Sequence, residues 1–312
     1  MCVGDVLWSG RRYKLQHGRI MQKMKTVSLV LGSGGARGLA HIGVIHWLEE
    51  NGYTISSISG CSMGALVGGI YAIGKLDEFE QWVRAVTKSD MVKLLDLSLG
   101  TDGLFKGGKI IETLKDLVGD SKIEDLPISF TAVAANISRA KEVWFDEGPM
   151  FDAIRASISM PIFFTPYKYK GQDLVDGGIL NPVPIAPTFS DHTDVTIAVN
   201  VCGPPIKNPE AVFREEPLVE LSPLSGAVSD FIGKIRSSMP HGTMNIGAFD
   251  IVSQSFETMQ STIARQKIAA YPPDHVLEVP KNLCTIMEFD KAESLISYGY
   301  SLAARCLPEA IG

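Results

Sequence analysis

The sequence lacks the cysteine patterns that hold disulfide frameworks or zinc sites. No two of its five cysteines form a C-x-x-C pair and no histidine lies at ligand spacing from them; they are Cys2, Cys61, Cys202, Cys284 and Cys306. An odd number of widely spaced cysteines is typical of a protein from a reducing compartment. The pattern therefore predicts a chain without structural zinc.

Long apolar segments are also missing. The longest apolar run, residues 64–74, is too short to cross a bilayer and is typical of a buried helix. The first 25 residues carry charges but no apolar stretch like that of a secretory signal. These absences predict a cytoplasmic protein, with peripheral contact at the inner membrane surface left open.

An excess of basic residues is the third absence. The chain has 29 Lys and Arg against 35 Asp and Glu, a formal net charge of -6, and no basic face is evident beyond the first 25 residues. This balance argues against nucleic acid as the main partner.

The 312 residues, 45% of them hydrophobic, are enough to bury one large core. Residues 1–24 lack periodicity and are predicted to be an extension that is disordered or precedes the true start. Because no repeat or linker divides the remainder, residues 25–312 are predicted to form one domain. The motif-bearing core of this domain covers about residues 25–203, and residues 204–312 complete it at the C-terminal side. The segment 204–225 is rich in Pro, Glu and Ser and is predicted to be a surface loop.

Strand and helix patterns alternate along the first part of this domain. Residues 25–32 and 53–59 are typical of strands, and each is followed by an apolar helix. Such a βαβα order predicts an α/β fold, a three-layer sandwich with a mostly parallel central sheet and helices on both faces. Further helices are expected near 76–88, 107–119, 150–160, 250–270 and 291–306, and strands near 128–138, 141–148, 193–203 and 275–280.

Ser62 lies between one of these strands and its helix, in the sequence Gly-Cys-Ser-Met-Gly. A serine in this position is commonly a helix N-cap. A sharp turn from strand to helix would instead expose the hydroxyl as a nucleophile, and Gly60 and Gly64 then avoid collisions on either side of it. The setting favours the nucleophile. Cys61 is one residue early and is interpreted as a small buried hydrophobe.

A glycine-rich loop, residues 31–43, joins the first strand to the first helix. It fails the G-x-G-x-x-G dinucleotide pattern because Arg37 stands in place of the third glycine, and no G-K-[ST] of a P-loop follows. Free backbone N–H groups in such a loop suit an anion. Beside a serine nucleophile, that anion would be the oxyanion of an acyl intermediate.

Asp176 precedes Gly177 and Gly178 on a turn after a strand, where an Asx-type turn is the simpler interpretation. The six histidines lie in polar segments or on different faces of one helix, so we interpret each as structural.

Four motifs in order resemble the patatin-like phospholipases, specifically the bacterial branch similar to neuropathy target esterases. They are GSGGARGLAHIGV at 32–44, GCSMGALVGGIYA at 60–72, IRASISMPIFFTP at 154–166 and DGGILNPVPI at 176–185. The resemblance implies that Ser62 is the nucleophile, that Asp176 is its partner in a two-residue dyad, and that the oxyanion hole is formed by Gly34, Gly35, Ala36, Arg37 and Gly38. Ser33 departs from the pattern, because many members have glycine there.

The combined prediction is a serine acyl hydrolase that cleaves carboxylic esters of lipids, of phospholipase A or lysophospholipase type, through an acyl-enzyme. It needs no metal or organic cofactor, and its partners are a lipid ester and, transiently, a membrane surface. The alternative is a regulatory or interaction protein of the same fold with little turnover. The apolar stretch 159–167 would line an acyl groove or pack under the sheet. Neither the lipid nor the oligomeric state follows from the sequence.

Overall fold

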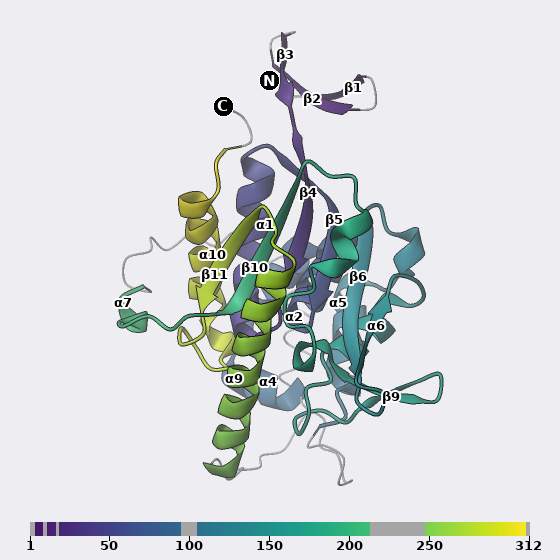
Figure 1. Ribbon diagram of the computed structural model, residues 1–312, viewed down its shortest axis with the longest axis vertical. Coiled ribbons are helices and arrows are strands. Elements are labelled where there is room, and N and C mark those ends of the chain that lie inside the picture. The colour runs from purple at the N-terminus through teal and green to yellow at the C-terminus, as the bar shows by residue number, and fades with distance from the viewer. Residues whose placement is uncertain (1–3, 9–10, 17–18, 95–104, 213–246, 310–312) are drawn as a thin grey trace.

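The computed structural model describes residues 4–8, 11–16, 19–94, 105–212 and 247–309 (Figure 1). At its centre is an eight-stranded sheet, in which β7 pairs with β6 beside the main path. Four strand pairs, from β11 to β6, are parallel, and β7, β8 and β9 pair antiparallel. The strands are, in spatial order, β11 (His275–Pro280), β10 (Val195–Gly203), β4 (Lys25–Leu31), β5 (Tyr53–Cys61), β6 (Ser129–Asn136), β9 (Gln172–Asp176) and β8 (Tyr167–Tyr169), with β7 (Lys141–Phe145) off the path.

Helices cover both faces of this sheet. On one face, α1 (Ala40–Glu50), α2 (Met63–Ala72), α6 (Met150–Ser157) and α10 (Ala292–Cys306) share a large core with Leu29 and Val199. On the other face, Ala264 of α9 (Gly247–Ala270) packs with Val30 and Ala198. Figure 1 shows α9 in front of β10 and α1 behind the strands. The predicted three-layer α/β sandwich is confirmed.

Two glycines let α1 and α10 cross closely. A Cβ at Gly43 would lie 1.9 Å from the carbonyl oxygen of Ile296, and one at Gly299 would lie 2.0 Å from that of Ala40. Any side chain at either position would force the helices apart. The C-terminal helix is thereby held against the helix that follows the glycine-rich loop.

The other helical elements of the domain are short helices and 3-10 turns. The predicted surface loop 204–225 is described up to residue 212 and contains a short helix there; the rest of that prediction lies outside the described residues. The elements are α3 (Leu76–Ala85), α4 (Lys88–Leu94), α5 (Gly108–Val118), α7 (Pro209–Val212), and the 3-10 turns η1 (Gly35–Leu39), η2 (Ile123–Asp125), η3 (Gly177–Ile179), η4 (Ala186–Ser190) and η5 (Phe289–Lys291).

The N-terminal extension differs from the expectation of a segment without regular structure. Its described residues form a separate antiparallel sheet of β1 (Gly4–Trp8), β2 (Arg11–Gln16) and β3 (Arg19–Lys23). The strands are only five or six residues long, and only Arg11–Gln16 alternates polar and apolar residues, so the sequence pattern is too short to separate from a loop. Figure 1 shows this small sheet projecting beyond the N-terminal end of β4.

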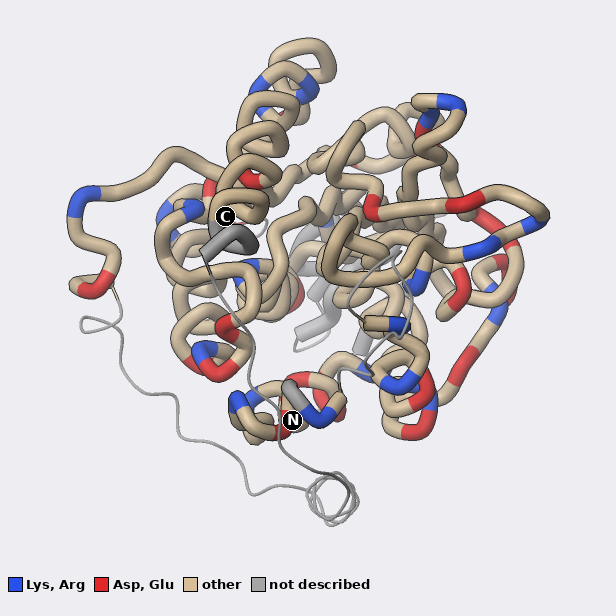
Figure 2. Tube along the Cα trace, turned by 90° about the horizontal axis from the view of Figure 1, so that it is seen from below, with Lys and Arg blue, Asp and Glu red and all other residues tan. Residues whose placement is uncertain are grey.

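Charged residues are distributed over the periphery. Figure 2 shows Lys and Arg positions interspersed with Asp and Glu around the rim of the molecule. Among the described residues, four with ionisable acidic or strongly basic side chains are buried, namely Arg37, Asp90, Arg155 and Asp176. None of the described helices is long and apolar enough to cross a membrane.

Candidate active site

Ser62 occupies a strained turn between β5 and α2. Its φ of 55° and ψ of −122° lie in a backbone region that residues other than glycine rarely adopt. Its backbone N–H donates to the hydroxyl of Ser157, 2.8 Å away. Ser62 stands at the N-cap position, yet its hydroxyl makes no capping hydrogen bond to the helix. The simple capping interpretation therefore does not account for this serine.

The flanking glycines fit the turn for steric reasons. A Cβ at Gly60 would lie 2.5 Å from the carbonyl oxygen of Gly64, and a Cβ at Gly64 would lie 2.0 Å from that of Leu31. The turn thus packs directly on the end of the neighbouring strand β4. This close approach brings Ser62 beside the glycine-rich loop that follows β4.

Asp176, at the end of β9, is 1% exposed and lies against Ser62. Burial raises the pKa of its carboxyl to about 6, while hydrogen bonds from the Ser62 side chain, the Gly178 N–H, Cys61 and Ser33 act to lower it. The Gly178 N–H lies 2.7 Å from Oδ1. The same bond caps η3, so the turn-stabilising interpretation of Asp176 is also correct. All these donors are neutral, which explains why the buried carboxyl keeps a raised pKa.

The thiol of Cys61 lies beneath this pair. Cys61 is fully buried, with Sγ 3.9 Å from Asp176 Oδ1. Burial, followed by the charge of Asp176, raises the pKa of the thiol well above its usual value. A thiol that stays protonated and buried is a poor nucleophile.

The five residues predicted to form the oxyanion hole divide into two groups. Gly34 and Gly35 line the same pocket as Ser62 and Asp176. The other three support the loop. Ala36 N–H donates to the carbonyl oxygen of Ile286 at 3.0 Å, and Gly38 packs so closely on Met63 that an added Cβ would lie 2.4 Å from the Met63 Cβ.

The side chain of Arg37 is buried behind the loop. Its Nε donates to the carbonyl oxygen of Val201 at 3.0 Å, and its Nη1 donates to Glu257 at 2.8 Å. Nη1 also donates to the carbonyl oxygens of Lys281 and Cys284, each at 3.0 Å. The guanidinium thereby ties the glycine-rich loop to the C-terminal part of the chain.

A pocket opens beside Ser62, Asp176, Gly34 and Gly35. The space open to the centre of a water-sized sphere within it is about 100 Å³. Its walls are mainly apolar, and the predicted acyl-groove stretch contributes Met160, Phe163 and Phe164. Sequence patterns did not single out the residues that complete it from α3, α5 and the C-terminal segment, including Phe79, Trp82, Val83, Ile110, Leu114, Phe256, Gln260, Ile286, Met287 and Phe289. Their spacing is that of ordinary amphipathic helices and loops.

The described histidines lie outside the walls of this pocket. His41 Nε2 lies 2.9 Å from the carbonyl oxygen of Gly32, and burial lowers its pKa to about 4. His46 Nε2 lies 2.5 Å from Glu80 Oε2 on the helix surface. His17 and His241 lie outside the described residues. The described part of the chain contains no cluster of three His, Cys, Asp or Glu side chains that could hold a metal ion.

Comparisons with known proteins agree with this fold and motif order. The patatin-like phospholipase family model matches residues 29–189. An uncharacterized NTE family protein of Mycobacterium tuberculosis is 36% identical over 328 aligned positions, which cover 90% of this chain and 91% of the relative. The lysophospholipase nte1 of Emericella nidulans is 32% identical over 185 positions, covering 57% of this chain but 12% of that protein.

Among solved structures, VipD from Legionella pneumophila superposes with a TM-score of 0.50 at 13% identity, covering 97% of this chain and 69% of that one. This likeness concerns the fold alone. The family match and the full-length relative, in contrast, include the segments that carry Ser62, Asp176 and the glycine-rich loop. The chain therefore belongs to the patatin-like phospholipase family.

Proposed function

We propose that this protein is a serine acyl hydrolase that cleaves carboxylic esters of lipids through a Ser62–Asp176 dyad. The observation that carries the proposal is the meeting of Ser62, Asp176, Gly34 and Gly35 at one apolar pocket. The pocket walls suit an acyl chain, and the polar groups gather where its carbonyl would lie. The Emericella nidulans relative is a lysophospholipase by name, which supports a lipid ester as substrate.

In the first half of the reaction, Asp176 accepts the proton of Ser62 Oγ while Oγ attacks the acyl carbon. The carbonyl electrons move onto oxygen, and the N–H groups of Gly34 and Gly35 donate to that oxyanion. The ester C–O bond then breaks, and the departing alcohol takes the proton from Asp176. The products of this step are the alcohol and an acyl-Ser62 ester.

In the second half, Asp176 removes a proton from water as the water oxygen attacks the acyl-Ser62 carbonyl. Collapse of the intermediate breaks the bond to Oγ, releases the fatty acid and returns the proton to Ser62. A pKa of about 6 makes Asp176 a stronger base than an exposed carboxylate, yet leaves it mostly ionised at neutral pH.

We also propose that the protein touches lipid surfaces transiently at the pocket rim. Met287 lines the pocket and is 36% exposed, and Ile162, within the apolar stretch beside the pocket, is 45% exposed. Exposed apolar side chains at the pocket would let a lipid enter without crossing open water.

The test is covalent labelling with a fluorophosphonate, followed by a panel of phospholipids and lysophospholipids analysed by mass spectrometry. Ser62→Ala should abolish both labelling and hydrolysis while the fold is retained. Cys61→Ala is the matched control, because it removes the thiol next to Ser62 in the sequence and should keep most activity. Labelling that persists in Ser62→Ala would contradict the assignment, and a folded wild type that hydrolyses no ester would favour the regulatory alternative.

A further inference from the structure

Helix α9 contributes a buried polar side chain to the candidate active site. Gln260 is 3% exposed and lines the same pocket as Ser62 and Asp176. It lies beyond residues 29–189, the part of the chain that the family model matches. Its position in the site therefore depends on the C-terminal part of this chain.

Gln260 is hydrogen-bonded to Ser33, a neighbour of the dyad. Its Nε2 donates to Ser33 Oγ at 2.8 Å. Because that hydroxyl oxygen accepts from Gln260, its own proton can point toward Asp176, and the Ser33 side chain acts to lower the pKa of that carboxyl. The Ser62 side chain, which lines the same pocket as Asp176, acts on the pKa of the carboxyl in the same direction.

The orientation of the Gln260 amide follows from its other neighbour. The single thiol proton of Cys202 is shared between two acceptors, the Ser33 carbonyl oxygen at 3.2 Å and Gln260 Oε1 at 3.8 Å from the sulfur. Burial raises the pKa of Cys202, which keeps the sulfur protonated and therefore a donor. With the amide oxygen facing Cys202, the NH₂ group faces Ser33.

Gly178 makes room for this arrangement. A Cβ built on Gly178 would lie 2.0 Å from Gln260 Nε2, 2.6 Å from Ser33 Oγ and 3.0 Å from Asp176 Oδ1. All three polar atoms therefore lie next to the position that a Gly178 side chain would occupy, and any side chain there would push them apart. The second glycine after Asp176 therefore has a specific role in this chain.

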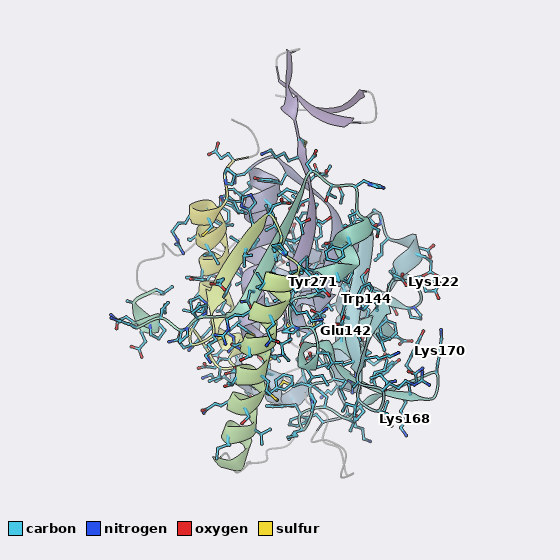
Figure 3. All side chains as sticks on the ribbon, in the orientation of Figure 1. Lys122, Glu142, Trp144, Lys168, Lys170 and Tyr271 are labelled. Carbon is cyan, nitrogen blue, oxygen red and sulfur yellow. The ribbon has the colours of Figure 1, made fainter. Side chains whose placement is uncertain are left out.

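Two ion pairs hold α9 on either side of Gln260. Glu257 accepts from Arg37 at 2.8 Å, and Lys267 donates to Glu142 of β7 at 2.7 Å. Glu142 also accepts from Trp144 and Asn181, each at 2.9 Å. Figure 3 shows Glu142 and Trp144 beside Tyr271, at the C-terminal end of α9. These two ion pairs hold α9 in position, so that Gln260 stays beside the candidate active site.

The charged groups packed around the dyad are mostly paired with one another. Near the dyad, Arg37 pairs with Glu257, Lys267 pairs with Glu142, Arg155 of α6 donates to Ser159, and burial raises the pKa values of the Cys61 and Cys202 thiols. Hydrogen bonds from neutral donors, rather than a cation, therefore control the carboxyl.

We propose that Ser33 and Gln260 are positioning residues, which hold the Asp176 carboxylate ionised and turned toward Ser62. This inference rests on the proposed role of Asp176 as the base. The serine in place of the glycine found in many relatives is then part of a pair with Gln260, and helix α9 belongs to the site.

The experiment measures the rate of fluorophosphonate labelling of the full-length chain against pH. Removing a donor to a carboxylate raises its pKa, so the acidic limb of the profile should move to higher pH. Ser33→Ala and Gln260→Leu should each shift it upward by about one pH unit. Ser33→Gly, which restores the residue of many relatives, serves if Ser33→Ala does not fold.

Matched controls remove similar groups from the same elements. Ser28→Ala deletes a buried hydroxyl on β4 that contacts Asp191 and Thr193, and Gln254→Leu changes an exposed glutamine on α9. Both should leave the acidic limb in place. If the pH profiles of the Ser33 and Gln260 variants superpose on that of wild type, the inference is wrong. If only the Ser33 variant shifts the acidic limb, Gln260 is not a positioning residue. Labelling that survives Ser62→Ala would instead refute the proposed function.

Discussion

The backbone N–H of Ser62 donates to the hydroxyl of Ser157, which itself donates to the carbonyl oxygen of Val133 at 2.6 Å. Ser157 is the last residue of α6 and is fully buried. It therefore links the strained turn to strand β6. A turn with positive φ persists only where the surrounding structure holds it, and this hydroxyl is part of that support.

Removing the Ser157 hydroxyl should weaken both the fold and the site. We expect Ser157→Ala to lower the free energy of unfolding by about 1–3 kcal/mol, because a buried N–H loses its acceptor. Fluorophosphonate labelling of Ser62 should also slow. Urea unfolding and labelling rates measure the two effects, with Ser255→Ala on the exposed side of α9 as the control. A variant equal to wild type in both would show that the turn does not depend on Ser157.

The conformation of Gly35 should be essential for hydrolysis. Its φ is +58°, and an added Cβ would lie 2.6 Å from the carbonyl oxygen of Ile286. Gly35→Ala should displace the loop amides and reduce kcat about 10²- to 10³-fold, the usual effect of losing an oxyanion donor. Gly74→Ala is a matched control, since Gly74 has φ +70° with nothing within 4 Å. Equal kcat values for the two variants would argue against the loop as the oxyanion hole.

Asp176, and no histidine, should act as the base. Asp176→Asn keeps the shape and removes the charge, so we expect turnover to fall at least about a hundredfold. Each of the six His→Gln variants should stay within about tenfold of wild type, near 1.4 kcal/mol in barrier, when activity is normalised to folded protein. A folded histidine variant as inactive as Asp176→Asn would replace the dyad with a triad.

Burial of Asp176 should also make stability depend on pH. Its pKa rises from 3.8 to about 6 on folding, so the folded state favours the protonated form. That contribution to stability is present below pH 4 and is lost as the pH rises through 6. Relative to Asp176→Asn, wild type should lose about 2–3 kcal/mol of unfolding free energy between pH 4 and pH 8.

Urea unfolding of both proteins at the two pH values gives this difference directly. Exposed Asp146→Asn is the control, because it removes a carboxylate of similar charge from the surface. A constant difference between wild type and Asp176→Asn across this range would mean that the buried carboxyl is not destabilised on ionisation.

The N-terminal sheet should be dispensable for hydrolysis. Strands β1–β3 pair only with one another among the described strands, and Met24 Sδ, which contacts the Thr54 hydroxyl at 4.0 Å, is kept in a chain that starts at Met24. Such a chain should match the full chain in melting temperature and ester hydrolysis. A drop in melting temperature of more than about 5 °C would indicate that the extension stabilises the domain. Liposome flotation of both chains tests whether its basic and aromatic residues bind lipid.

Local sequence was sufficient to identify the turn and the loop. Ser62 between Gly60 and Gly64, after an apolar strand, specifies a strand-to-helix turn, because the steric requirements all fall within five consecutive residues. The glycine-rich loop was likewise recognised from adjacent residues. Asp176 was different: its neighbours alone favoured a turn stabiliser, and only the order of four motifs singled it out. The structure explains the ambiguity, since the same carboxyl caps η3 and contacts Ser62.

Sequence alone also determined the α/β class and the alternation of strands and helices, because periodicity and glycine placement act over a few residues. Only the tertiary structure decided which loop residues line the pocket, which side chains form its walls, and that Gln260 reaches Ser33. Those features depend on the register of α9 against the sheet, which packing and two long-range ion pairs set. The raised pKa of Asp176 has the same origin, because removal of a carboxyl from water is a property of the assembled core and of no single segment.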